Sequence, residues 1–179
     1  MQQAYSLVCR SFDSGGLAEC CLEEGVRLLA YSPLAMGLLT HKYASASDER
    51  RAMPAPTHTS GAKDGTGNGN AKREATSSFR LHMYRGRYAE AEARYPLGRR
   101  RLQRAVASYA RCAREMGMAP LELALRFVLS HASLGAAVVG ATSTQQLDAL
   151  VEAAAKGPLD AAALEAVDAI HADEPNPAP

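Results

Sequence analysis

A short apolar run that leads directly into a turn occupies residues 26–37, which read Val26-Arg27-Leu28-Leu29-Ala30-Tyr31-Ser32-Pro33-Leu34-Ala35-Met36-Gly37. The β-forming residues 26–30 predict a strand of the kind that a parallel sheet buries on both faces. An apolar segment at residues 4–8 predicts a strand before it, and residues 17–24 predict an intervening helix that ends at Gly25. Strand, helix and strand in this order are typical of an α/β fold.

The second half of the chain continues this alternation. Residues 97–116 form the longest helical pattern, and residues 121–129 predict a further helix with Pro120 in its first turn. Residues 136–139 then predict a third apolar strand. The remaining elements that we expect are helices over residues 144–155, with Thr142 or Ser143 as N-cap, and over residues 159–171, followed by a stiff proline-rich tail at 172–179.

The longest helical pattern has two distinct sides. One side carries the apolar stripe Leu102, Val106, Tyr109, Ala113 and Met116, which we expect to face the core. The opposite side carries arginines, and two interpretations are open: a solvated helix face, or a localisation or nucleic-acid patch. A formal charge of only +1 and the lack of interleaved aromatic residues favour the solvated face, so no nucleic-acid partner is expected.

Composition changes sharply between residues 44 and 78, where Ser, Thr, Gly, Pro, Asn and charged residues dominate. Such a segment cannot bury enough apolar area to offset the entropy of ordering it, so it predicts a disordered insertion. Its Gly65 and Gly67 do not make a phosphate-binding fingerprint, because no strand precedes them and no helix follows.

The whole chain has 179 residues, of which 47% are hydrophobic and 22% charged, as in a globular protein. No apolar run approaches the roughly 18 residues that span a bilayer, and the N-terminus lacks the pattern of a secretory signal. We therefore expect a cytoplasmic protein without a membrane partner, with its four cysteines as free thiols. The histidines lack metal-ligand spacing, so no metal is predicted.

Two positions in this pattern suit ligand chemistry. The turn at residues 31–37 leaves the carboxyl end of a strand, where α/β folds bind ligands, and Tyr31 offers a ring for stacking. The segment Gly140-Ala141-Thr142-Ser143 opens a helix, where backbone N–H groups suit a phosphate. Each also has an ordinary interpretation, as a plain turn and as a capped helix.

Taken in order, these phrases resemble one family. The phrases that carry the resemblance are residues 2–12, residues 28–43 with Leu28-Leu29-Ala30-Tyr31-Ser32-Pro33-Leu34-Ala35-Met36-Gly37-Leu38-Leu39-Thr40-His41-Lys42-Tyr43, residues 123–128, Val139-Gly140-Ala141-Thr142-Ser143 and residues 175–179. Together they are similar to the aldo-keto reductases, in the branch that includes relatives of potassium-channel β subunits. The resemblance implies a (β/α)8 barrel that reduces carbonyl groups with NADPH.

The resemblance also implies roles for individual residues. Gln2 would hold the nicotinamide carboxamide, Tyr31 would stack on the nicotinamide ring, and Ser32, Pro33, Leu34, Ala35 and Met36 would line the pyrophosphate. Lys42, Arg80, Gly140, Thr142 and Gln146 would surround the adenosine and its 2′-phosphate. Lys42 and Arg80 also have the interpretation of simple surface charge.

This chain departs from the family pattern in two ways. Ala149 and Leu150 stand where the family carries a Glu-Asn pair against the adenine. The segment that would carry the catalytic Asp, Tyr, Lys and His should precede Gln2, so we assign no catalytic residue here. Without residues 44–78 the chain is also far shorter than the about 250 residues of a complete barrel.

We therefore expect a partial barrel, made of its last three strands and their helices. The domain would comprise residues 1–43 and 79–171, with open edges that an N-terminal half or another protein covers. Two functions follow from this expectation. The chain is part of an NADP-dependent carbonyl oxidoreductase and inactive alone, or it is a non-catalytic nucleotide-binding or interaction module similar to channel β subunits.

Overall fold

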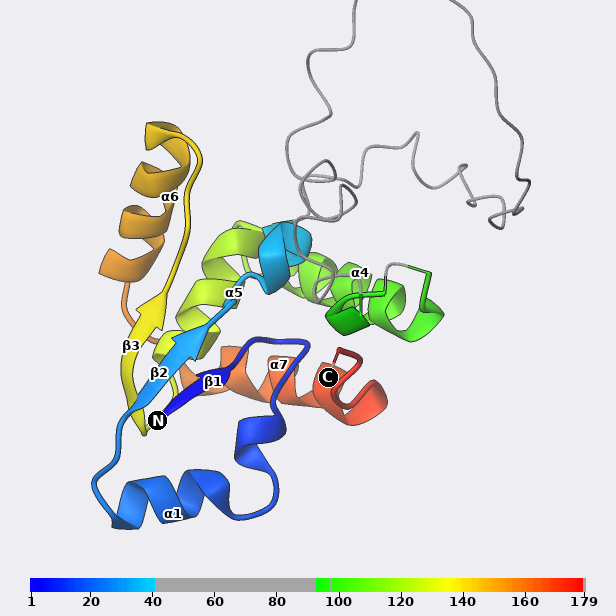
Figure 1. The fold of residues 1–179 in the computed structure, drawn as a ribbon. Coiled ribbons are helices and arrows are strands. Elements are labelled where there is room, and N and C mark those ends of the chain that lie inside the picture. Colours follow the sequence, from blue (N-terminus) through cyan, green and yellow to red (C-terminus); the bar gives the residue numbers. More distant parts are fainter. Residues whose placement is uncertain (41–92, 97, 179) are drawn as a thin grey trace, which may run out of the picture.

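The computed structural model describes residues 1–40, 93–96 and 98–178. Its sheet has three parallel strands in the order β1 (Gln2–Ala4), β2 (Leu28–Tyr31) and β3 (Leu134–Val138) (Figure 1). Ala4 pairs with Tyr31 and Tyr31 with Val138, so the carboxyl ends of all three strands meet at one edge. The predicted α/β architecture with a parallel sheet is confirmed.

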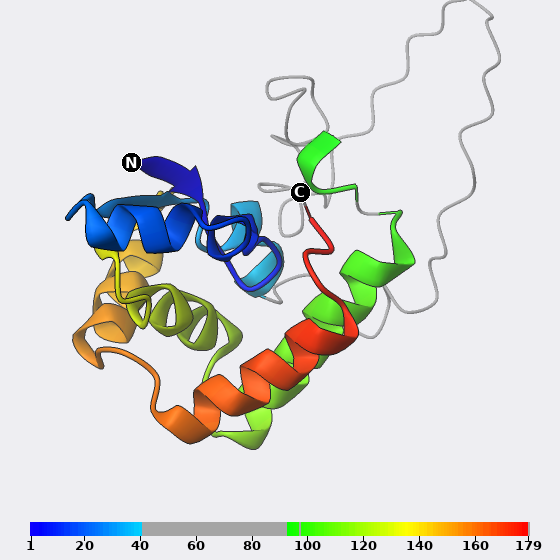
Figure 2. The same ribbon diagram turned by 90° about the horizontal axis from the view of Figure 1, so that it is seen from below.

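Helices connect and cover these strands. Their bounds are α1 (Leu17–Glu23), α4 (Arg100–Glu115), α5 (Pro120–Leu129), α6 (Thr144–Ala155) and α7 (Ala161–Asp173), with short 3-10 helices η1 (Ser11–Asp13) and η2 (Ala35–Thr40). Helices α4 and α7 lie side by side, as Figure 2 shows. Helix α5 packs against α4 and β3, which places the core on the helical side of the sheet.

Several local predictions are confirmed. Pro120 is the first residue of α5, and α6 spans residues 144–155 with the Ser143 hydroxyl as its N-cap. On α4 the stripe through Leu102 and Tyr109 is buried, while Arg104 on the other side is exposed. Arg101 and Arg104 both bond to Glu174 just beyond α7, which fits the solvated-face interpretation of this arginine run.

The prediction of a strand over residues 4–8 is wrong in its position. β1 covers residues 2–4, and the chain reverses where Ser6 and Cys9 exchange two backbone hydrogen bonds of 3.0 and 3.1 Å. The side chains of Tyr5, Leu7 and Val8 are nevertheless almost fully buried. These residues are apolar because they are buried in the core. A buried irregular segment and a short strand therefore give the same apolar pattern in the sequence.

The boundaries of the other two strands also differ from the prediction. β2 begins at Leu28 and includes Tyr31, and β3 begins at Leu134, two residues earlier than expected. A register shift between Leu28 and Leu29 leaves Gly135 as an extra residue, and a Cβ added to Gly135 would lie 2.8 Å from the Cβ of Arg27. Glycine is thus required at position 135, because Arg27, directly before β2, approaches too closely for any side chain.

The sequence pattern of residues 26–30 is that of a strand buried on both faces, but in the described residues only one face of the sheet is covered. Leu28 and Ala30 are 0% exposed, whereas Leu29 between them is 38% exposed. Val138, which shares the face of Leu29 through the register, is 45% exposed. One face is therefore packed by helices and the opposite face, which we call the open sheet face (Gln2, Leu29, Tyr31, Ala136 and Val138), is not covered by described residues.

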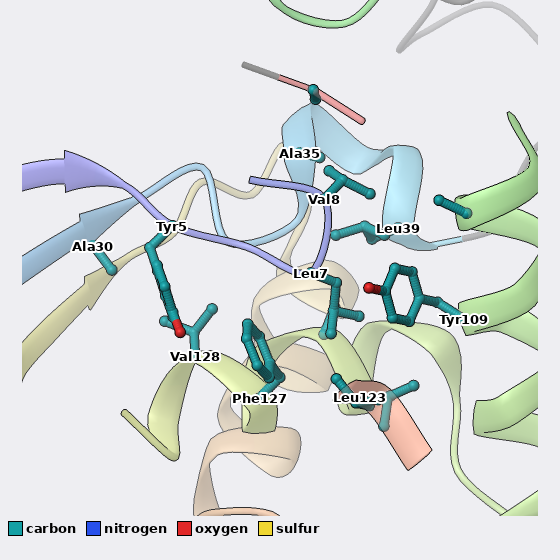
Figure 3. Close-up of a cluster of buried hydrophobic side chains, with 14 of the residues drawn as sticks. Tyr5, Leu7, Val8, Ala30, Ala35, Leu39, Tyr109, Leu123, Phe127 and Val128 are labelled. Carbon is teal, nitrogen blue, oxygen red and sulfur yellow. The ribbon is translucent and has the colours of Figure 1, made fainter. Parts of the chain in front are cut away.

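The main core lies between the sheet, α5 and the segment after β1. Figure 3 shows Tyr5 and Phe127 close to Val128, with Leu7 between Phe127 and Tyr109. The rings of Tyr5 and Phe127 are stacked with centroids 5.4 Å apart. The C-terminal tail joins this core, because Ala178 is buried and its N–H donates to the carbonyl oxygen of Val8 at 3.0 Å.

Some predictions lie outside the described residues. These are the insertion at residues 44–78, the two candidate ligands Lys42 and Arg80, and the start of the long helix at residue 97. Within the described ranges, no helix combines the length and the apolar character that a membrane span requires.

Candidate functional site

The turn that follows β2 forms one side of the candidate site. Tyr31 ends the strand with its side chain half-buried. Ser32, Pro33 and Leu34 lead into η2, whose first residues are Ala35 and Met36. The turn is attached to the core, because the side chains of Ala35 and Leu39 are buried there. Backbone hydrogen bonds from Ala35 to Ser32 and from Gly37 to Leu34, of 2.9 and 2.8 Å, close it tightly.

This turn concentrates residues in the left-handed region of backbone space. Ser32, Ala35 and Met36 have φ angles of 56°, 48° and 56°, although none of them is glycine. Each such residue stores about 1 to 3 kcal/mol, which persists only where the surrounding packing fixes the conformation. Strained backbone of this kind clusters at active sites and ligand-binding turns, and here it lies within the segment of residues 32–36 that the sequence suggested.

The segment that follows β3 forms the other side of the site. Ser143 caps α6 by accepting a 3.3 Å hydrogen bond from the backbone N–H of Gln146. In return, Gln146 Oε1 accepts from both the backbone N–H and the hydroxyl of Thr142, at 3.0 and 3.1 Å. This reciprocal pattern is a variant of the capping box, and it brings the predicted residues Thr142 and Gln146 into direct contact.

The N-terminus of α6 keeps the features that an anion needs. The first turn holds no acidic residue, and Gly140 has open space where a Cβ would be. Backbone N–H groups at a helix start carry a partial positive charge, which favours a phosphate. Because Tyr31 pairs with Val138, this helix start and the strained turn after β2 lie at the ends of adjacent strands.

Gln2 lies on the same sheet face as Tyr31. It pairs with Leu29, two residues before Tyr31, and its side chain is exposed on the open sheet face. Strand spacing and residue rise then put Gln2 and Tyr31 about 8 Å apart between Cα atoms. The structure therefore brings Gln2 near Tyr31, whereas Lys42 and Arg80 lie outside the described residues.

Packing connects the two sides of the site. Leu34 from the turn after β2 contacts the apolar cluster that Leu125, Leu150 and Ala153 form between α5 and α6. Leu150 is only 3% exposed, so it belongs to this cluster and cannot contact a bound ligand. Ala149 is exposed but has only a methyl group, so neither of the two residues can replace polar contacts to an adenine.

A residue that the sequence interpretation missed lies over Tyr31. The guanidinium carbon of Arg94 is 5.3 Å from the centroid of the Tyr31 ring, which is cation–π geometry. The neighbouring Tyr95 is 1% exposed and fixes this part of the backbone in the core. An arginine next to a buried aromatic residue was the available signal, but it stands far from the turn in sequence.

The described tyrosines other than Tyr31 are weaker acids than a free phenol. Burial raises the pKa of Tyr95 to about 12, and burial together with the Asp13 carboxylate raises the pKa of Tyr5. Burial also raises the pKa of Tyr109, although Arg10 opposes the shift. A general acid works best with a pKa near the working pH, so these phenols do not suit that role.

A separate pocket of about 380 Å³ lies among α1, α5, α7 and the segment after β1. Its lining includes Tyr5, Arg10, Asp13, His131 and Asp168, and none of the predicted site residues. Its polar groups bond to one another: the Tyr5 hydroxyl donates to Asp13 at 2.9 Å, and His131 Nε2 lies 3.1 Å from the same carboxylate. The backbone N–H of Ser133 donates to His131 Nδ1, so this imidazole is a donor toward Asp13. The network joins the segment after β1 to α5 and α7.

The described residues show no cluster of His, Cys, Asp or Glu that could hold a metal ion. All four cysteines, which lie within the described ranges, are free thiols as predicted.

The chain is similar to several known proteins in sequence and in fold. The chain is 34% identical over 179 residues to the protein Tas of Escherichia coli strain K12, covering all of this chain and 41% of Tas. Among solved structures, it resembles the aldo-keto reductase AKR11C1 of Bacillus halodurans in holo form, with 20% identity and a TM-score of 0.54, over 94% of this chain and 41% of that one. It also resembles the glycerol dehydrogenase AKR11B4 of Gluconobacter oxydans, with 19% identity and a TM-score of 0.59, over 98% and 42% of the two chains.

The solved neighbours are TIM barrels, and the chain spans about 41% of the length of the curated relative that it matches. The model of the aldo/keto reductase family matches residues 1–172, which is nearly the whole chain. Members of that family generally use NAD(P)H. The chain described here belongs to the aldo/keto reductase family.

Proposed function

We propose that this chain supplies the NADP(H)-binding surface of a carbonyl-reducing aldo-keto reductase. The observation that carries the proposal is the pairing of two features at one sheet edge. The strained turn after β2 and the capped N-terminus of α6 follow adjacent parallel strands, where α/β folds bind nucleotides. Each alone is an ordinary structural feature, but together they form a site for a flat ring next to phosphates.

The residues at this edge then take distinct roles. Tyr31 would stack on the nicotinamide ring, and the exposed Gln2 would bond its carboxamide. Backbone groups of Ser32, Pro33, Leu34, Ala35 and Met36 would line the pyrophosphate. Gly140, Thr142 and Gln146, with Lys42 and Arg80, would bind the adenosine and its 2′-phosphate, as helix starts and cations do for phosphates.

The described residues fit the phosphate groups of this cofactor better than its adenine. The α6 N-terminus lacks acidic residues in its first turn, and the open space at Gly140 admits a phosphate close to the backbone. Thr142 and Gln146 already bond to each other and would share their remaining groups with the ligand. The adenine end fits less well, because Leu150 is buried and Ala149 offers no polar group.

We further propose that β1, β2 and β3 are the sixth, seventh and eighth strands of a (β/α)8 barrel. The resemblance of residues 2–12, 28–43 and 139–143 to later segments of the family carries this placement, and the parallel order β1-β2-β3 fits it. The open sheet face, on which Leu29 is 38% and Val138 45% exposed, would then be the barrel interior. The N-terminal half of a barrel, or another protein, would cover this face and the two free strand edges.

The isolated 179-residue chain would bind the cofactor without reducing a carbonyl. NADPH supplies a hydride when bound, and this chain's residues would orient its nicotinamide ring on Tyr31. Reduction also needs a proton at the carbonyl oxygen, and the raised pKa values of Tyr5, Tyr95 and Tyr109 do not suit them for donating it. The same observation favours a second candidate for the isolated chain, a non-catalytic nucleotide-binding or interaction module.

A cytoplasmic location is part of the proposal. Cys20 is exposed, while Cys9, Cys21 and Cys112 are buried as free thiols. Free thiols of this number persist best in a reducing compartment.

The proposal is tested by titrating NADPH with the purified chain and with a Tyr31→Leu variant, following cofactor fluorescence. Loss of the stacking ring should weaken binding by about three- to tenfold. The control is Leu22→Ala on α1, an exposed apolar residue away from the ends of β2 and β3, and it should bind as the wild type does (Figure 1). Equal affinity in all three chains would contradict the assignment of Tyr31.

A further inference from the structure

Arg94 lies where it affects the ring that would hold the nicotinamide. Its guanidinium carbon is 5.3 Å from the centroid of the Tyr31 ring, at the carboxyl end of β2. Cation–π pairs of this kind draw on the negative charge of the ring face. The π-electrons of the Tyr31 ring thus already interact with the positive charge of Arg94.

The backbone of this segment is held in place. Tyr95, directly after Arg94, is 1% exposed and belongs to the main core with Ala35 and Leu39 from the turn after β2. Pro96 follows and accepts a 2.9 Å hydrogen bond from the backbone N–H of Arg99, just before α4. The buried ring of Tyr95 therefore places the adjacent Arg94 close to the turn after β2.

The two redox forms of a nicotinamide differ in charge, because the oxidised ring carries a positive charge and the reduced ring is neutral. If the nicotinamide displaces the guanidinium from the ring, Arg94 remains nearby and repels the oxidised form. If the nicotinamide stacks on the opposite ring face, Arg94 draws electron density away from it and again disfavours a cationic partner. In both arrangements Arg94 weakens binding of the oxidised cofactor relative to the reduced cofactor.

We infer that Arg94 sets a preference of this site for the reduced over the oxidised cofactor. The inference rests on the proposed function and deepens it. Arg94 acts as a specificity-determining residue that recognises the charge of the nicotinamide ring, whereas Thr142 and Gln146 would contact parts of the dinucleotide that do not change with its redox state.

The test compares the dissociation constants of NADPH and NADP⁺ for the 179-residue chain and three variants. Arg94→Gln removes the charge and should lower the ratio Kd(NADP⁺)/Kd(NADPH) by about three- to tenfold, mainly through tighter binding of NADP⁺. Arg94→Lys keeps the charge and should keep most of the ratio. Arg114→Gln, an exposed arginine in the last turn of α4, is the matched control and should leave the ratio unchanged.

The outcomes separate this inference from the proposed function. NADPH binding with an unchanged or increased ratio in Arg94→Gln overturns the role of Arg94 and leaves the cofactor site standing. A fall in the ratio that Arg94→Lys shows equally would also overturn it, because the charge would then not matter. A chain that binds neither dinucleotide contradicts the proposed function and this inference together.

Discussion

The Nη1 atom of Arg10 donates to Asp168 Oδ1 at 2.6 Å and so joins the segment after β1 to α7 across 158 residues of sequence. The guanidinium carbon also lies 4.3 Å from the centroid of the Phe127 ring, and the backbone N–H of Arg10 donates to Asn176 Oδ1 at 2.6 Å. Arg10 is only 6% exposed, so one buried cation connects β1, α5, α7 and the C-terminal tail.

Replacement of Arg10 should therefore destabilise the chain more than replacement of its partner. Arg10→Met removes the buried cation, its ring contact and its bond to the Val167 carbonyl, and should lower the free energy of unfolding by about 2 to 4 kcal/mol. Asp168→Asn should lower it by less, because the asparagine oxygen can still accept from Arg10 Nη1 and Arg10 keeps its bond to the Val167 carbonyl. Urea denaturation measures both, with Arg114→Met as an exposed control near zero. Equal losses in the two variants would show that the ion pair alone matters.

The cap of α6 gives a second stability prediction. Ser143→Ala removes the hydroxyl that accepts from the Gln146 N–H and should lower the free energy of unfolding by about 1 kcal/mol. Ser143→Asp keeps a cap acceptor and should restore the stability, but its negative charge at the proposed phosphate site should weaken NADPH binding. Thr144→Ala, one residue further along, is the control that changes neither. An Asp variant that binds NADPH as tightly as the wild type would argue against phosphate at this helix.

Adjacent leucines on β2 test whether one sheet face is open. Leu28 is 0% and Leu29 38% exposed, although they are neighbours in the same strand. Leu28→Ala should lower the free energy of unfolding of the isolated chain by about 2 to 5 kcal/mol, and Leu29→Ala by less than about 1 kcal/mol. Binding of a hydrophobic dye should decrease in Leu29→Ser. Comparable destabilisation by the two alanine variants would mean that the face is covered in solution.

The pH dependence of stability should follow His171 in its neutral form. Burial, and then the positive charge of Arg10, lower the pKa of His171 below its usual 6.5 in the folded chain. The unfolded chain then binds the proton more readily, so the stability due to His171 is present above about pH 6.5 and is lost as the pH falls toward the lowered value. His171→Leu should have a smaller loss of unfolding free energy between pH 7 and pH 5. A slope identical to that of the wild type would show that another group controls this range.

Glu122 should control the pH dependence of stability at lower pH than His171 does. Burial alone would raise its pKa, but hydrogen bonds from Lys156 and Arg126 outweigh burial and lower it below its usual 4.5. Since the folded chain holds this carboxylate more acidic than the unfolded chain does, the stability it contributes is present above about pH 4.5 and is lost below it. Glu122→Gln should be less stable than the wild type at pH 7 and approach it as the pH falls through this range. A difference that stays constant with pH would contradict this reading.

The sequence predicted helix positions well because their signals are local. Pro120 at a first turn, Ser143 at a cap and the stripe through Leu102 and Tyr109 each act within a few residues, and each is confirmed. Strand positions were less predictable. Tyr5, Leu7 and Val8 are as apolar as a strand, but the Ser6–Cys9 reversal that follows β1 leaves no local mark.

In the candidate site, too, features with local sequence signals could be predicted and contacts between distant residues could not. The turn after β2 and the start of α6 were predicted because strand ends and helix caps are visible in the sequence. Arg94 and the Arg10 network were missed, because their partners Tyr31 and Asp168 lie 63 and 158 residues away and only the fold brings them together. The buried position of Leu150 likewise depends on contacts with α5, which sequence alone does not give.

The cofactor surface is tested most directly by titrating the purified 179-residue chain into NADPH and, separately, into NADH, following cofactor fluorescence. Saturable binding that is tighter for NADPH is expected, with no oxidation of the cofactor when an aldehyde is added. No saturable binding of NADPH, by a chain that denatures cooperatively in urea and is therefore folded, would contradict the assignment of the cofactor surface to the ends of β2 and β3.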